Sequence, residues 1–143
     1  GCACPENTVL KRMLTKLLLS PAQVVLLDME AGVEHLGRGT IAGVDNLLIV
    51  VIPSKSSVRT AQKIKKLAVD SGIPKISFVG NLVQDEDDEN FLEEALGETP
   101  AAFFTDSSVI RKAERNGQPL TQLTEPMTEA PDKLVAFLQQ SQG

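Results

Sequence analysis

The sequence is poor in aromatic side chains and carries no excess of positive charge. Its 143 residues include no tryptophan and no tyrosine, and the aromatic residues are five phenylalanines. Lys and Arg number 14 against 19 Asp and Glu, so the formal net charge is −5. A chain with few rings to stack on bases and with a net negative charge does not fit a general nucleic-acid-binding protein. We therefore expect no nucleic-acid partner and a core of Leu, Val, Ile and Ala.

Long hydrophobic runs are also missing. No stretch approaches the roughly 18 apolar residues of a membrane-spanning helix, and the N-terminus lacks the organisation of a signal peptide. We therefore expect no membrane partner and a cytoplasmic location. A chain of 143 residues is long enough to bury its own core. We expect one domain over residues 1–143.

The sequence contains no glycine-rich loop for nucleotide phosphates. Neither G-x-x-x-x-G-K-[ST] nor G-x-G-x-x-G occurs in it. Such loops place backbone N–H groups around phosphates, and catalysis of phosphoryl transfer consists mostly of positioning and charge stabilisation by these groups. We therefore expect that this chain alone does not hydrolyse ATP.

Apolar runs alternate with amphipathic segments along the chain. The expected strands are Val24–Asp28, Leu47–Ile52, Lys75–Gly80 and Ala101–Thr105. The expected helices are Thr8–Leu19, Ser56–Ser71 with Gly72 as its C-cap, an acidic helix capped by Asp87 or Asp88 and stopped by Gly97, a helix capped by Asp106 or Ser107 and ending at Arg115, and Asp132–Gln140. Strands that alternate with helices predict an α/β fold with a parallel sheet.

Two polar residues follow expected buried strands. Asp28 ends the run VVLLD, and the carboxyl end of a parallel strand is where ligands bind in open α/β sheets. The pattern is that of a Walker B acid, which holds Mg²⁺ near a nucleotide; the alternative is an ordinary loop acid. Asn81 follows the third strand, and its amide could hydrogen-bond the edge of a purine or simply cap the turn.

Cysteine is scarce, and the two that occur are close together. Cys2 and Cys4 are separated by one residue, a spacing at which a mutual disulfide is unfavourable. Two thiolates form half of a tetrahedral metal site, so a symmetric dimer would complete a site for Zn²⁺ or, with planar geometry, Ni²⁺. The alternative is a pair of ordinary thiols.

Taken together, the segments GCACPEN, VVLLDMEAGVEHLGRGT and GVDNLLIVVIPSKSSVRTAQKI resemble a known family. They are similar to the C-terminal half of the CooC-like accessory ATPases for nickel insertion into carbon monoxide dehydrogenase. These ATPases belong to the MinD/ParA-type deviant Walker A P-loop proteins. The resemblance implies a three-layer, partial P-loop NTPase fold, with a mostly parallel sheet flanked by helices and without the N-terminal P-loop strand.

The resemblance also implies roles for single residues. Asp28 matches the catalytic acid near Mg²⁺, and Asn81 matches the asparagine that contacts adenine. The segment with Phe104, Thr105 and Asp106 matches a loop near the adenine of ATP or ADP. Leu82 departs from the Lys or Arg that often follows this asparagine in relatives, and Phe104 stands where many have proline.

Metal, partners and function follow from the same resemblance. Cys2 and Cys4 match the pair through which a homodimer shares Ni²⁺ or Zn²⁺. The implied partners are the missing N-terminal half, a second copy of the chain, and apo carbon monoxide dehydrogenase as client. The implied function is nickel insertion by an accessory ATPase. The alternatives are a non-catalytic metal-binding or dimerisation module and a ParA/MinD-like partitioning ATPase.

Overall fold

The computed structural model describes residues 24–29, 44–120, 123 and 129–140. Cys2, Cys4 and the expected helix Thr8–Leu19 lie outside the described residues. The chain divides into two compact units, one of residues 1–47 and 63–76 and the other of residues 48–62 and 77–143. The single domain over residues 1–143 stays a prediction. Within the described residues, no helix has the length and apolar character needed to cross a membrane.

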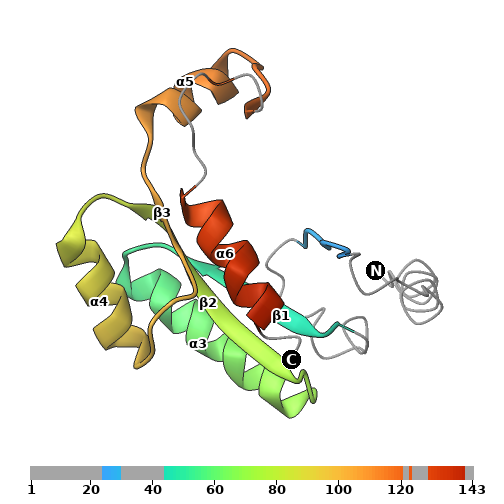
Figure 1. Ribbon diagram of the computed structural model, residues 1–143. Coiled ribbons are helices and arrows are strands. Elements are labelled where there is room, and N and C mark those ends of the chain that lie inside the picture. The colour runs from blue at the N-terminus through green and yellow to red at the C-terminus, as the bar shows by residue number, and fades with distance from the viewer. Residues whose placement is uncertain (1–23, 30–43, 121–122, 124–128, 141–143) are drawn as a thin grey trace, which may run out of the picture. The chain divides into compact units, whose positions relative to one another are not determined.

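Strands and helices alternate along the described chain, as the sequence predicts (Figure 1). The elements are β1 (Asn46–Val51), α3 (Lys55–Asp70), β2 (Lys75–Val83), α4 (Glu86–Leu96), β3 (Phe103–Thr105), α5 (Ser108–Arg115) and α6 (Glu129–Gln140). The strands form a parallel sheet in the order β1-β2-β3. The expected α/β fold is confirmed.

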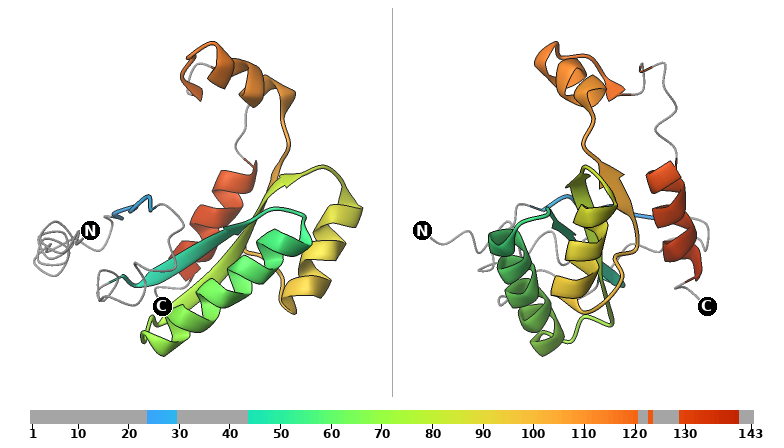
Figure 2. Two further views of the ribbon diagram at one scale, coloured as in Figure 1. Left: turned by 180° about the vertical axis from the view of Figure 1, so that it is seen from behind. Right: turned by 90° about the vertical axis from the view of Figure 1, so that its left-hand side faces the viewer.

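In the unit of residues 48–62 and 77–143, helices cover the sheet. α4 and the first part of α3 lie side by side over one face of the sheet, and α6 lies on the other side (Figure 2). The Gln62 side-chain amide donates to the Ala95 carbonyl at 2.9 Å, which ties α3 to the end of α4. The largest fully buried side chains are Phe78, Leu92, Val51 and Val83. Burying these side chains supplies the main stabilisation of this unit.

The other unit has a smaller cluster around the end of α3. Gly72 adopts a left-handed conformation with φ 76°, and the Ile73 N–H donates to the Ala68 carbonyl at 3.1 Å. This is the geometry of a glycine that ends a helix, as the sequence predicts. Met29 and Val44 pack against Ala68 and Ile73.

The expected strand Val24–Asp28 is not a strand in the structure. Residues 24–29 have no regular secondary structure, and Val24 and Leu26 are 70% and 82% exposed. A strand needs neighbours that pair with its backbone N–H and C=O groups. The sheet that the described residues form includes no residue of this segment. The prediction of a buried strand here is therefore wrong.

The third expected strand is longer than predicted. β2 runs to Val83, whereas the sequence predicts a strand that ends at Gly80. Asn81 accordingly lies within the strand, and the prediction that it follows the strand is wrong. The reason is pairing: the Asp106 N–H donates to the Val83 carbonyl at 2.8 Å, so β2 continues alongside the end of β3.

The acidic helix begins earlier than expected. Its N-cap is Asp85, and the prediction of Asp87 or Asp88 is wrong. The Asp85 carboxylate accepts from the Asp88 N–H at 3.1 Å, and the Asp88 carboxylate accepts from the Gln84 N–H at 2.9 Å. This reciprocal capping satisfies two backbone donors, and it requires Asp85 as the N-cap residue. Gly97 ends the helix with φ 74°, as predicted.

Candidate functional site

The carboxyl ends of β2 and β3 are joined by an irregular pairing. Gly80 pairs with Phe103 and Val83 pairs with Thr105, so the register shifts between them. Three steps along β2 therefore match two steps along β3. One extra residue in one of two paired strands is a β-bulge, a feature that redirects side chains near the edge of a sheet.

Hydrogen bonds close the pairing on both sides of the bulge. The Gly80 N–H donates to the Ala102 carbonyl at 2.9 Å, and the Asp106 N–H donates to the Val83 carbonyl at 2.8 Å. Asn81 and Leu82 lie between these two bonds. The backbone on either side of Asn81 is thus held by the two residues that flank β3, Ala102 before it and Asp106 after it.

Leu82, at the bulge, has a strained backbone conformation. Its φ is 55°, and it is the only non-glycine residue with positive φ among the described residues. An L-residue in this region costs roughly 1–2 kcal/mol, because Cβ approaches the carbonyl oxygen. Leu82 is 46% exposed, so only part of its apolar surface is buried.

The structure brings four of the predicted site residues together at this edge. Asn81 lies in β2, Phe104 and Thr105 lie in β3, and Asp106 follows β3 directly. Asn81, Phe104 and Asp106 are partly buried, and Thr105 is exposed. Polar groups that are held by a sheet yet reach its surface are suited to bind a small ligand.

Asp106 forms an ion pair that was not predicted from the sequence. The Arg111 guanidinium hydrogen-bonds to the Asp106 carboxylate and forms an ion pair with it. Of the two predicted caps of α5, Asp106 and Ser107, the structure has Ser107, whose hydroxyl accepts from the Ile110 N–H at 3.4 Å. Ser107 therefore fixes the start of the helix that carries Arg111. The sequence feature that indicates this ion pair is the spacing: Asp106 directly precedes the capped helix, and Arg111 lies about one turn into it.

The roles predicted for Asp28 and the two cysteines stay predictions. Asp28 is exposed and belongs to the unit of residues 1–47 and 63–76. Cys2 and Cys4 lie outside the described residues. Within the parts of the chain that the structure describes, no group of three or more His, Cys, Asp or Glu side chains could hold a metal ion.

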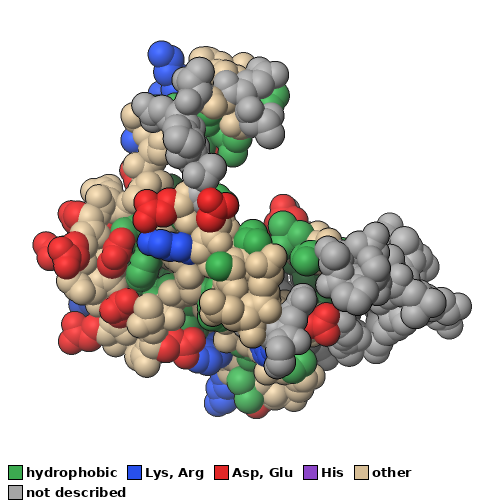
Figure 3. All heavy atoms as spheres, in the orientation of Figure 1, with side chains coloured by type: hydrophobic (Ala, Val, Ile, Leu, Met, Phe, Trp, Pro, Cys, Tyr) green, Lys and Arg blue, Asp and Glu red, His purple; other side chains and the backbone are tan. Residues whose placement is uncertain are grey.

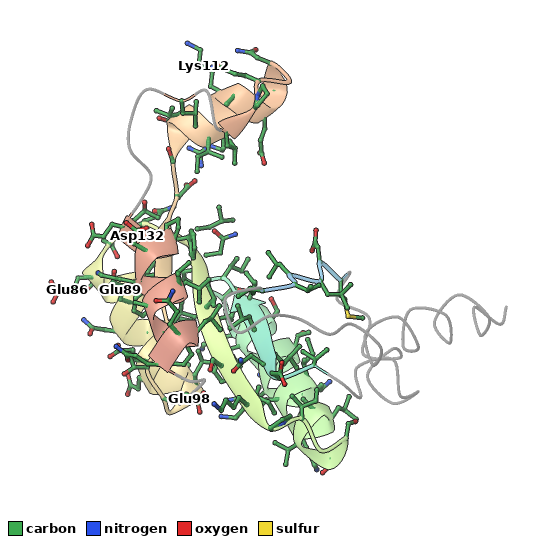
Figure 4. All side chains as sticks on the ribbon, turned by 45° about the vertical axis from the view of Figure 1, so that its right-hand side comes forward. Glu86, Glu89, Glu98, Lys112 and Asp132 are labelled. Carbon is green, nitrogen blue, oxygen red and sulfur yellow. The ribbon has the colours of Figure 1, made fainter. Side chains whose placement is uncertain are left out.

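Acidic side chains gather over α4 (Figure 3). Glu86 and Glu89 lie in its first turn, Glu98 follows its end, and Asp132 lies in α6 (Figure 4). Negative charge in the first turn stabilises a helix through its dipole. This accounts for the acidic run of the sequence without a ligand.

Comparisons with known proteins give relatives by sequence and similarity to a solved structure. No protein-family model matches the chain. The carbon monoxide dehydrogenase accessory protein CooC of Rhodospirillum rubrum is 44% identical over 92 residues, which cover 64% of this chain and 35% of that protein. The uncharacterized ATP-binding protein MJ0823 of Methanocaldococcus jannaschii is 43% identical over 123 residues, which cover 84% of this chain and 48% of that protein.

Among solved structures, the MinD cell division protein of Aquifex aeolicus has a similar fold. The TM-score is 0.57 at 17% identity, and the match covers 71% of this chain and 46% of that one. This likeness concerns the fold. The chain spans about half the length, or less, of the curated relatives that it matches.

Proposed function

Because the chain is CooC-like in sequence and has the MinD fold, we propose that it is part of an accessory ATPase for nickel insertion into carbon monoxide dehydrogenase. We propose further that the carboxyl ends of β2 and β3 bind the adenine of ATP or ADP. The observation that supports this most is the placement of Asn81 beside Phe104, Thr105 and Asp106, which lie more than twenty positions later in the sequence. Relatives with names that state ATP binding support the choice of nucleotide.

The chemistry of the edge suits a purine base. A carboxamide offers an N–H donor and a carbonyl acceptor in one plane. Adenine presents an amino donor beside a ring-nitrogen acceptor, so an asparagine can bind it through two hydrogen bonds. Asp106 does not present its polar groups to the base in this proposal, because its carboxylate pairs with Arg111 and its N–H donates to the Val83 carbonyl. We propose that Asp106 holds the backbone beside the base.

The remaining parts of the proposal concern Mg²⁺ and the transferred metal. Asp28 is proposed to hold Mg²⁺ of the nucleotide, since a hard cation prefers oxygen ligands. Cys2 and Cys4 are proposed to bind Ni²⁺ or Zn²⁺ between two copies of the chain, as soft thiolate ligands do. Nucleotide binding would drive metal transfer if the closed and open dimers differ in metal affinity. The phosphate loop, which this sequence does not contain, would have to come from a further segment.

Replacing Asn81 by alanine tests the base-binding part. We expect Asn81→Ala to weaken adenosine binding about tenfold, because two hydrogen bonds to the base are lost. The measurement is calorimetric titration of the 143-residue chain with adenosine and, for comparison, with guanosine. Asn90→Ala, an exposed asparagine of α4, is the matched control and is expected to bind as the unchanged chain does. Equal affinity of the Asn81 variant and the unchanged chain would exclude base recognition by Asn81.

A further inference from the structure

The end of α5 carries an asparagine that is followed by a glycine. Asn116 is the C-cap residue of the helix, and Gly117 comes next. Glycine has no Cβ, so its backbone nitrogen can approach the preceding side chain more closely than the nitrogen of any other residue. Both residues are exposed. Every other asparagine of the sequence precedes a larger residue: these are Asn7, Asn46, Asn81 and Asn90.

Backbone hydrogen bonds hold this asparagine and glycine in the closed end of the helix. The Gly117 N–H donates to the Glu114 carbonyl at 3.1 Å, and the Gln118 N–H donates to the Ala113 carbonyl at 2.9 Å. The ψ angle of Asn116 is −1°, which keeps the Gly117 nitrogen away from the Asn116 carboxamide. The last turn of a helix opens at little cost in free energy. Nothing lies within 4 Å of a Cβ placed on Gly117, so the opened peptide has room to rotate.

We propose that Asn116 is a site of spontaneous deamidation, and that opening of the last turn of α5 controls the rate. This inference does not depend on nucleotide or metal binding. In the opened turn the Gly117 nitrogen gives up its proton to the solvent and attacks Cγ of Asn116. A bond forms between this nitrogen and Cγ, the bond between Cγ and the side-chain nitrogen breaks, and ammonia leaves. The product is a five-membered succinimide ring.

Water from the solvent then opens the ring in one of two ways. Cleavage of the new bond to Cγ gives aspartate at position 116. Cleavage of the bond between the Gly117 nitrogen and the backbone carbonyl carbon gives isoaspartate, in which the main chain runs through Cβ and Cγ. The ammonia is lost in both cases, so the modified fraction grows with the age of the protein.

Either product changes the end of α5. Both place a new carboxylate at the carboxyl end of the helix, where the helix dipole disfavours negative charge. Lys112 and Arg115 in the last turn offset part of this charge. Isoaspartate also lengthens the main chain, which moves the Gln118 N–H away from the Ala113 carbonyl that it binds. We therefore expect the modified helix end to be less stable than the original one.

The experiment is incubation of the 143-residue chain at mildly alkaline pH, in buffer and in urea, followed by proteolysis and mass spectrometry of the peptides. We expect Asn116 to lose ammonia in both samples and isoaspartate to accumulate at this position. Asn90 is the matched control within the same chain, because it is exposed too but precedes Phe91. It is expected to stay intact. Urea is expected to speed the reaction of Asn116 about tenfold, since the turn no longer has to open.

Gly117→Ala separates the attack by the nitrogen from the opening of the turn. Its Cβ hinders the attack on Cγ, whereas a φ of 65° is unfavourable for alanine and so favours opening. We expect slower loss of ammonia from Asn116 in this variant than in the unchanged chain. A faster or equal loss would refute ring closure through the nitrogen of residue 117.

The remaining results decide the other parts of the inference. Modification of Asn116 in urea but not in buffer would mean that the helix end stays closed, and the native protein would then have no such site. Equal rates in buffer and urea would refute control by opening. Equal modification of Asn116 and Asn90, or none at Asn116 in either sample, would refute the site itself.

Discussion

Gly80→Ala is expected to lower the free energy of unfolding by about 1–3 kcal/mol, the usual cost of overpacking a core. A Cβ at this position would lie 2.5 Å from Cδ1 of Phe103 and 3.2 Å from Cδ1 of Leu92. The first distance is too short for any contact between carbon atoms. Phe103 pairs with Gly80 across the sheet, and Leu92 is fully buried. Neither neighbour can move without disturbing the core between β2, β3 and α4.

Urea denaturation measures this loss, because the midpoint and slope give the free energy of unfolding. Phe103→Leu in the Gly80→Ala background is expected to restore part of the lost stability, since the smaller side chain makes room for Cβ. A double-mutant cycle then gives a favourable coupling between the two substitutions.

Gly117→Ala is the control for removing a glycine as such. Nothing lies within 4 Å of a Cβ placed there, and its φ is 65°, so alanine there meets only the backbone penalty. We expect a loss of about 1 kcal/mol from this variant and no coupling to Phe103. If Gly80→Ala unfolds at the same urea concentration as the unchanged chain, the tight packing of β2 against Phe103 is refuted.

Replacing Cys2 and Cys4 together by serine is expected to abolish stoichiometric nickel or zinc binding. The thiolate is the ligand that soft and borderline metals prefer, and a serine hydroxyl at neutral pH does not replace it. These are the only cysteines of the chain, so no other thiolate could take over. The measurement is metal content per chain after equilibrium dialysis, with the dimer content from sedimentation in the same samples.

Two controls make the metal experiment specific. Asp28→Asn removes a carboxylate but no thiol, and we expect it to retain the metal. Circular dichroism of the Cys2→Ser, Cys4→Ser variant is expected to match that of the unchanged chain, because both cysteines precede the elements that the structure describes. Stoichiometric metal in the double serine variant would refute metal binding by the cysteine pair.

Local sequence signals were sufficient for most helix ends. Gly72 and Gly97 end their helices in left-handed conformations, as predicted, and α5 is capped by Ser107, one of the two residues predicted as its cap. Each signal acts through residues a few positions apart, so it can be read from the sequence. The start of α4 shows the limit of this approach. Several consecutive acids could each cap the helix. In the structure the Asp88 N–H donates to the Asp85 carboxylate, so Asp85 is the N-cap.

The features that depend on distant residues could not be read in this way. The apolar composition of Val24–Leu27 predicts burial, but burial requires neighbours, and Val24 is 70% exposed in the structure. β2 extends past Gly80 because Val83 pairs with Thr105, a residue more than twenty positions away. A leucine with positive φ is rare, so no local pattern indicates the bulge at Leu82. The convergence of Asn81 with β3, by contrast, follows from the parallel sheet that the sequence predicts.

Chemical-shift mapping of adenosine on the ¹⁵N-labelled chain tests adenine binding at the ends of β2 and β3 most directly. We expect saturable shifts of the backbone amides of Asn81, Thr105 and Asp106, at the carboxyl ends of β2 and β3. We also expect that amides of the acidic α4 helix do not respond, because its first turn has no feature that binds a base. Saturable shifts centred on α4, or none at the ends of β2 and β3, would contradict the proposal that this edge binds the adenine.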